Sequence, residues 1–189
     1  MLQEISESIS ILNNIKSDDY LLDVISDVGM VITRVLKAGN KVMFAGNGGS
    51  AADSQHLAAE LVGRFSINRP GLPGMALTTD SSILTAVGND YGFDQVFERQ
   101  VLAHGVEGDM FIGLSTSGRS INLVKALSAA RERGVISVAL TGSHGGDMKD
   151  LCDYSIRVPS DVTQKIQEAH ILIGHSICAY AEKQIFAKG

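Results

Sequence analysis

Residues 41–61 read KVMFAGNGGSAADSQHLAAEL, and this stretch decides the fold. Its first six residues form a short apolar run that suits a buried strand, and a helical pattern follows over 51–65. A strand that turns tightly into a helix is typical of the repeating unit of a parallel sheet. The stretch therefore predicts an α/β domain whose first strand ends in a glycine-rich loop.

The glycines of that loop are Gly46, Gly48 and Gly49, directly before the helix. Ser50 or Asn47 is the expected N-cap, and the free N–H groups of the first helical turn favour an anion. The spacing G-x-G-G differs from the dinucleotide fingerprint G-x-G-x-x-G, and no lysine follows as in a Walker loop. A structural turn and a phosphate-binding loop are both compatible with the glycines alone.

Four further apolar runs downstream predict buried strands. They are GMALTT (74–79), DMFIGLST (109–116), VISVALTG (135–142) and YSIRVP (154–159). The stretches between the runs are mostly helical, at 51–65, 81–103, 119–133 and 161–187, and 143–152 has no clear pattern. This alternation predicts a five-stranded parallel sheet with helices on both faces, a three-layer flavodoxin-like arrangement.

Two amphipathic helices precede the first strand. Apolar residues recur every three or four positions from Leu2 to Ile15, and a second helix begins near Asp18 or Asp19 and stops at Gly39. We therefore expect one domain over 1–189, in which 1–39 are leading helices that pack on the sheet or on a partner subunit and 40–189 form the α/β core.

Composition excludes several classes of protein. The chain has 189 residues with a net charge of −5, and it lacks the basic stripe that nucleic-acid binding requires. We find no signal-peptide layout at the N-terminus and no apolar run of the ~18 residues that span a bilayer. Cys152 and Cys178 have no metal-ligand spacing and are expected as core thiols. These features predict a cytoplasmic protein.

A second polar loop follows the third predicted strand. Residues 115–120 read STSGRS, so three serines and a threonine surround Gly118 immediately before a helix. One hydroxyl suffices to cap a helix, whereas several hydroxyls with free N–H groups can surround a phosphate. Since ligands of parallel sheets bind at the carboxyl ends of the strands, this loop predicts a phosphate site next to the glycine loop.

At these two loops the sequence resembles the sugar isomerase (SIS) domain family and, within it, the phosphoheptose isomerases. The motifs that carry the resemblance are FAGNGGSAADSQHLAAELVGRF (44–65), LTTDSSILTAVGNDYGFDQVFERQV (77–101), GLSTSGRSINLVKA (113–126), ALTGSHGGDMKDLCDYSIRVPS (139–160) and IQEAHILIGHSICAYAE (166–182). The resemblance implies isomerisation of sedoheptulose 7-phosphate to D-glycero-D-manno-heptose 7-phosphate for bacterial surface heptose. It also implies a cytoplasmic homotetramer with active sites shared between subunits, and one zinc ion per subunit.

Two helices carry the side chains suited to such chemistry. His56 and Glu60 are one turn apart on the helix after the glycine loop, as two ligands of one metal or a base with its partner would be, although exposed surface pairs share this spacing. On the last helix, Gln167 lies about 80° and Glu168 about 20° from His175 around the axis. Helical geometry alone therefore does not select the partner of His175.

The resemblance makes that selection and assigns further residues. It implies a metal bound by His56, Glu60, Gln167 and His175, with Glu60 and His175 as the acid/base pair, whereas His170 is expected in the core or an interface. Implied substrate contacts are Asn47, Gly48, Gly49, Ser50, Asn89, Asp90, Ser115, Thr116, Ser117, Ser120 and Gln167.

Three points remain open in the sequence. The acidic residue that some relatives carry three positions before the ligand glutamine is replaced by Gln164, and Asp161 is out of register, so no catalytic aspartate is assigned. Arg64 and Arg69 are expected to add positive charge near the site. Two alternative functions are a non-catalytic SIS protein that binds a replication initiator and an SIS isomerase of another sugar phosphate.

Overall fold

Five parallel strands form one sheet in the computed structural model, which describes residues 1–186. The strands are β1 (Val42–Gly46), β2 (Gly74–Ala76), β3 (Met110–Ser115), β4 (Ile136–Thr141) and β5 (Tyr154–Arg157). Their spatial order is β2-β1-β3-β4-β5, which confirms the predicted flavodoxin-like sheet. Because β1 and β3 are neighbours, the glycine loop and the serine loop open at the same edge of the sheet.

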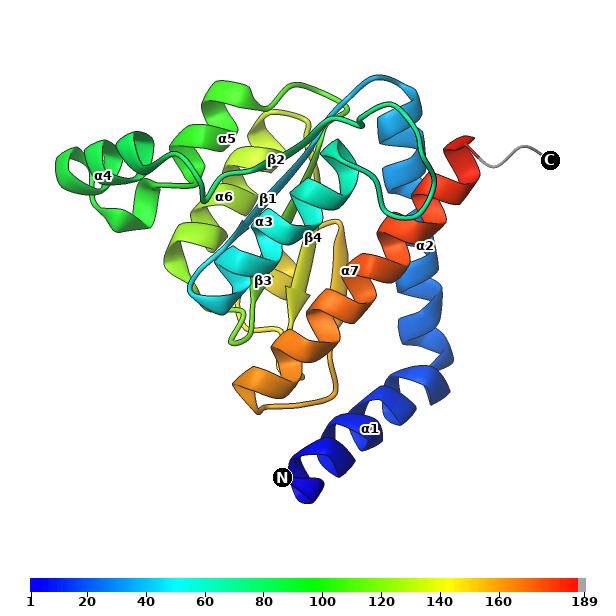
Figure 1. Cartoon of the computed structure of the whole chain (residues 1–189). Helices are drawn as coiled ribbons and strands as arrows, with labels where there is room; N and C mark the ends of the chain where they lie inside the picture. Colours follow the sequence, from blue (N-terminus) through cyan, green and yellow to red (C-terminus); the bar gives the residue numbers. More distant parts are fainter. Residues whose placement is uncertain (187–189) are drawn as a thin grey trace.

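Helices cover both faces of the sheet (Figure 1). They are α1 (Leu2–Ser17), α2 (Asp19–Lys37), α3 (Gly49–Val62), α4 (Ser81–Asp90), α5 (Glu98–His104), α6 (Ile121–Glu132) and α7 (Thr163–Phe186). Alternate residues of β3 face opposite ways: Ile112 packs with α2, α3 and α7, whereas Phe111 packs with α5 and α6. Two apolar cores, one on each side of the sheet, therefore make up the three layers.

The leading helices have the predicted boundaries. Asp18 caps α2 by accepting a hydrogen bond from the backbone N–H of Leu21 (3.0 Å), and Gly39 follows the helix with φ +81°. α2 packs along α7, whereas α1 projects from the body of the molecule and packs against α2 and α7 (Figure 1).

Two local predictions were wrong. The helix expected over 81–103 is broken into α4, a 3₁₀ turn (η1, Phe93–Gln95) and α5, because Gly92 adopts φ +96°, which ends a helix. The helix expected over 51–65 instead begins at Gly49 and ends at Val62, and its N-cap is Gly48, so neither Ser50 nor Asn47 caps it. The undefined stretch 143–152 contains a second 3₁₀ turn, η2 (Met148–Asp150).

The cysteines have no disulfide partner. Cys178 is buried in the core, where burial raises the pKa of its thiol to about 12, and Cys152 is half-buried. No helix within residues 1–186 is long and apolar enough to cross a membrane.

Candidate functional site

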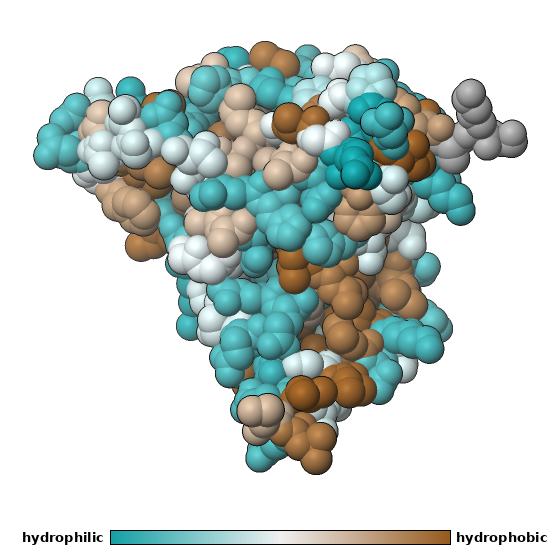
Figure 2. All heavy atoms as spheres, viewed as in Figure 1, coloured by the Kyte–Doolittle hydropathy of each residue, from teal (hydrophilic) through white to brown (hydrophobic). Residues whose placement is uncertain are grey.

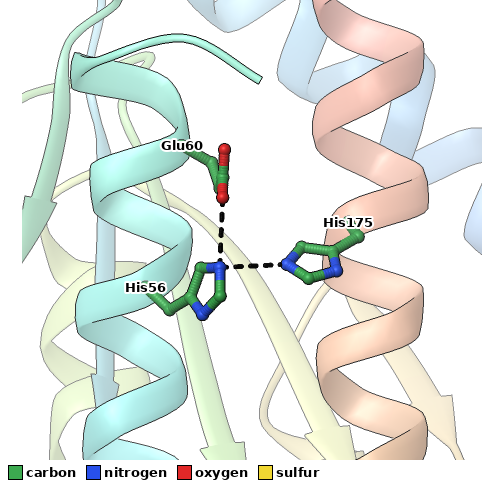
Figure 3. Close-up of side chains that lie close together, drawn as sticks. All are labelled: His56, Glu60 and His175. Carbon is green, nitrogen blue, oxygen red and sulfur yellow. Dashed lines mark hydrogen bonds and ion pairs between the residues drawn. The ribbon is translucent and has the colours of Figure 1, made fainter. Parts of the chain in front are cut away.

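Three side chains from two helices converge at one point on the surface (Figure 3). His56 Nε2 lies 3.0 Å from Glu60 Oε1 and 3.2 Å from His175 Nε2. All three ligand atoms lie within 4.8 Å of one another, and no other three His, Cys, Asp or Glu side chains of residues 1–186 do so. The pair on α3 thus gains a third member from α7, 119 residues away.

The two helices meet because small residues let them approach. α3 and α7 run in parallel: Gly49 faces Gln167, and farther along Leu57 faces Gly174. A Cβ on Gly174 would lie 2.5 Å from Leu57 Cδ2, so only glycine allows this spacing without movement. His56 and His175 are the immediate neighbours of this contact, which explains why their rings meet edge to face, 4.9 Å apart between centroids.

The donor set fits a divalent metal ion. Two imidazole nitrogens that face each other at 3.2 Å cannot both carry a proton in a stable contact, so at least one directs a lone pair inward. Glu60 adds a carboxylate oxygen, and two histidines with one glutamate form an established type of catalytic zinc site that leaves a position open. His56 is half exposed, so the group is accessible from solvent.

The other polar residues of α7 lie elsewhere. Gln167 lies about 12 Å before His175 along the axis of α7. The side-chain amide of Gln167 packs against Gly49 at the start of α3. Glu168 turns outward to Ser8 and Lys165 on the α1 side. His170 is fully buried, donates a hydrogen bond from Nε2 to the Thr141 carbonyl (3.2 Å), and is a core histidine as expected.

The serine loop is organised by its own hydroxyls. Ser115 Oγ lies 2.9 Å from Ser120 Oγ and accepts from the N–H of Gly118, while Ser117 Oγ accepts from the N–H of Arg119. Ser120 is the N-cap residue of α6, but its side chain makes no capping bond. Thr116 lies half-buried beside this cluster. The hydroxyls therefore gather at the start of α6 without being used to cap it.

This loop is joined to its neighbours. Asn47 of the glycine loop and Asn122 of α6 exchange two amide hydrogen bonds of 3.0 and 2.9 Å. Gly118 adopts φ +65°, and a Cβ there would lie 2.1 Å from the Gly145 carbonyl oxygen. The three loops after β1, β3 and β4 thus support one another, and Gly48, Gly49 and Ser50 directly follow Asn47 in the first of them.

Asn89 and Asp90 lie apart from the other predicted contacts. They are exposed at the end of α4, where Asn89 donates to Asp90 (2.8 Å). α4 has no buried residue and projects from the side of the molecule opposite α7 (Figure 1). Within one chain, this pair is therefore not brought to the group of His56, Glu60 and His175.

Arg69 was expected to add positive charge near the site, and its guanidinium does lie at the end of α3, where Nη2 donates to the Glu60 carbonyl (2.8 Å). Its guanidinium is buried in an ion pair with Glu182 (2.7 Å), next to the end of α3. Arg64 is exposed. Asp161 bonds to Ser143 and approaches His144 (3.6 Å) in the loop after β4.

Sequence reasoning missed two acidic groups. Glu182 has no local pattern that reveals its partner 113 residues away. Asp53, one turn before His56, has a buried carboxylate oxygen, Oδ2, without a hydrogen-bond partner among the described residues. Burial raises the pKa of Asp53, whereas the nearby His56 and His175 lower it.

Comparisons with known proteins find similar sequences over nearly the whole chain. A model of the SIS domain family matches residues 5–142. The phosphoheptose isomerase of Aneurinibacillus thermoaerophilus is 57% identical over 182 residues, covering 96% of this chain and 92% of the relative. Phosphoheptose isomerase 2 of Campylobacter jejuni is 53% identical, and the match covers 97% of this chain and 92% of the relative.

Solved structures are similar over the same range. The phosphoheptose isomerase of Neisseria gonorrhoeae superposes with a TM-score of 0.89 at 41% identity, covering 97% of this chain and all of the other (100%). The phosphoheptose isomerase of Francisella tularensis superposes with a TM-score of 0.90 at 37% identity, covering 96% of this chain and 95% of the other.

Proposed function

Since the chain belongs to the SIS domain family, we propose that it catalyses the aldose–ketose isomerisation of sedoheptulose 7-phosphate to D-glycero-D-manno-heptose 7-phosphate. The reaction serves heptose biosynthesis for bacterial surface polysaccharide. The observation that carries this conclusion is the convergence of His56, Glu60 and His175 on a chain 57% identical to a phosphoheptose isomerase. An SIS protein that only binds a replication initiator has no use for such a group.

The reaction requires a base close to a carbon acid. A proton leaves the carbon beside a carbonyl and returns to the neighbouring carbon through an enediol. Glu60 contacts His56 through Oε1, and within residues 1–186 its Oε2 makes no hydrogen bond, so we assign proton abstraction to Glu60. His175, which faces the same point, moves protons to and from the substrate oxygens.

The three converging side chains also suit a zinc ion, one per subunit. When bound by His56, Glu60 and His175, zinc would polarise the substrate carbonyl and offset the negative charge that develops on its oxygen. Gln167 is the fourth predicted ligand. Its amide lies at the glycine loop, and this position favours its substrate-binding role over its role as a ligand.

The loops at the sheet edge suit the phosphate and the polyol chain. We assign the phosphate to Ser115, Thr116, Ser117 and Ser120, because the three serine hydroxyls and the free N–H groups of α6 meet there and Thr116 lies between two of these serines in the chain. Asn47, Gly48, Gly49 and Ser50 border this cluster and are assigned to the substrate chain. His56 follows Gly49 by about 10 Å along α3, so the phosphate and the reacting carbons occupy different ends of the substrate site.

We further propose a homotetramer whose subunits share active sites. α1 projects with Leu2, Ile5 and Ile9 exposed, and Figure 2 shows brown apolar surface where α1 and α7 lie. Asn89 and Asp90, remote from the site in one chain, would contact substrate in a neighbouring subunit. The free thiols are in keeping with the cytoplasm, our expected compartment.

One assay tests the function. Purified protein is incubated with sedoheptulose 7-phosphate, and NMR follows the appearance of the aldose, first as isolated, then after chelation, then after zinc is returned. We expect conversion that chelation removes and zinc restores. No conversion in any sample would overturn the isomerase, and conversion of fructose 6-phosphate at a higher kcat/KM would assign a different sugar phosphate. Conversion that continues after chelation would support the isomerase activity but contradict the proposal that zinc takes part in it.

A further inference from the structure

A buried ion pair joins the ends of α3 and α7. Glu182, near the end of α7, pairs with Arg69 Nε at 2.7 Å, and both side chains are only 2% exposed. The Glu182 carboxylate also accepts hydrogen bonds from three consecutive backbone N–H groups, those of Phe65 (2.9 Å), Ser66 (2.7 Å) and Ile67 (2.9 Å). One carboxylate therefore holds the segment that follows α3 onto α7.

Arg69 completes the attachment from the other side. Its Nη2 donates to the backbone carbonyl of Glu60 (2.8 Å), and its Nη1 donates to the carbonyl of Leu61 (2.9 Å). These carbonyls belong to the last turn of α3, where helix geometry leaves acceptors without partners and where a cation is favourable. The guanidinium thus closes the helix end that carries Glu60.

The segment held by this pair touches the predicted metal site directly. The Phe65 ring packs against the His175 ring, with centroids 5.6 Å apart. Glu60 and His175, from different helices, are therefore both linked to the Arg69–Glu182 pair, the first through its backbone carbonyl and the second through Phe65.

We propose that Arg69 and Glu182 are positioning residues that set the distance and orientation of Glu60 and His175. The inference rests on the proposed function of that site. A buried ion pair contributes little net stability compared with apolar side chains of similar size, so stability alone gives no reason for one here. Directional bonds to three N–H groups and two carbonyls supply what apolar packing lacks, namely a fixed geometry for the side chains that must meet.

The test compares Glu182→Gln with a matched control. Asp109→Asn changes another buried carboxylate, 1% exposed, which accepts from the backbone N–H groups of Lys41 (3.0 Å) and Val106 (2.9 Å) and pairs with a lysine. Asp109 directly precedes β3, at the opposite end of the sheet from the loops. Both variants remove one buried charge, but only Glu182 is linked to the site.

Two measurements separate positioning from stability. The first is the ring C–H chemical shifts of His175 in metal-free protein, which respond to the Phe65 ring. The second is affinity for Co²⁺, followed by its visible absorption. We expect Glu182→Gln to shift the His175 signals and weaken Co²⁺ binding about 10-fold, the usual scale for groups that support metal ligands, and Asp109→Asn to change neither.

Equal behaviour of the two variants would overturn the proposal. If Glu182→Gln does not fold, Arg69→Lys serves instead: it keeps the charge but loses the planar fork, and the same His175 shifts and weaker binding are expected. If the wild-type protein binds no Co²⁺, the metal part of the proposed function fails. The His175 shifts then still decide whether Arg69 and Glu182 position the site.

Discussion

Gly174 in α7 lies directly against the side chain of Leu57 in α3, so that a Cβ on Gly174 would be 2.5 Å from Leu57 Cδ2 and 2.7 Å from Cδ1. His56 and His175 are the adjacent residues on the two helices. The distance between the helix axes at this contact therefore determines whether the two imidazoles meet.

Gly174→Ala should separate the helices at that point. The extra methyl group overpacks the contact, and we expect a loss of about 1–3 kcal/mol in the free energy of unfolding, measured by urea denaturation. Because the two imidazole nitrogens are 3.2 Å apart, we also expect weaker Zn²⁺ binding by calorimetry. A double variant, Gly174→Ala with Leu57→Ala, should recover binding. Unchanged Zn²⁺ affinity in Gly174→Ala would show that the close approach is not needed for the site.

Glu60→Gln should lower kcat by about 10²-fold or more, the usual scale for loss of a general base. The amide keeps an oxygen for a metal but is a very weak base. The NMR assay with sedoheptulose 7-phosphate measures the rate, and a Co²⁺ titration verifies that metal binding is retained. A folded Glu60→Gln protein with near wild-type turnover would end the assignment of Glu60 as the base.

Gly118→Ala should damage the phosphate loop. The position has φ +65°, which costs an alanine about 1 kcal/mol, and its Cβ would meet the Gly145 carbonyl at 2.1 Å, so the backbone must move. We expect the KM for sugar phosphate to rise at least about 10-fold. Inorganic phosphate, which should compete with substrate for this loop in the wild-type protein, should inhibit the variant less. Gly39→Ala is the matched control, because Gly39 has φ +81° but nothing within 4 Å of a Cβ, and it should leave KM unchanged.

His170 should make the protein less stable as the pH falls. Burial lowers its pKa from 6.5 to about 4, while its bond to Thr141 opposes the change. The unfolded chain thus takes up the proton first, and stability declines from pH 6.5 and levels off near pH 4, by up to about 3 kcal/mol. Urea denaturation between pH 7 and 4 measures this decline, and His170→Gln should flatten it. An unchanged slope in that variant would assign the decline to other groups.

Protonation of Glu182 should lower the stability of the protein in a more acidic pH range than protonation of His170, so its effect checks whether the decline near pH 6.5 to 4 belongs to His170. Burial alone would raise the pKa of Glu182, but hydrogen bonds from Ser66, Ile67 and Phe65 lower this pKa from 4.5 to about 2. Its contribution is complete above pH 4.5 and is lost as the pH falls toward 2. The His170 substitution should leave this second decline in place.

Ile5→Glu with Ile9→Glu should break up the proposed tetramer. Both side chains are 54% exposed on α1, and charges there oppose burial against another subunit. Light scattering should report a smaller assembly, and activity should fall with it if subunits share active sites. Gln3→Glu with Ser6→Glu, on the same helix, adds the same charge at polar positions and is expected to leave the mass unchanged. A tetramer that survives both pairs would exclude α1 from the interface.

Much of the fold followed from local patterns. Short apolar runs alternating with helical periodicity identified the strands, and their order in space agreed with the expected topology, because parallel strands joined by helices have few ways to pack. The missed break at Gly92 and the unused caps at Asn47 and Ser50 have one cause. Glycine conformation and side-chain partners such as Asn122 depend on what lies near them in space.

The candidate site also combines features that local sequence determines with features that only tertiary packing decides. The sequence by itself determined that His56 and Glu60 share one face of a helix, because a spacing of four residues is a property of the helix. Helical geometry did not select between Gln167 and Glu168 as the partner of His175, and it did not show which face of α7 meets α3, because the rotation of α7 toward α3 is not encoded in either helix alone. Tertiary packing decided it: Gly174 allows contact with Leu57, and Arg69 with Glu182 holds the helix ends together, so His175 faces His56. Long-range packing contacts, which no local periodicity records, convert two separate helix faces into one site.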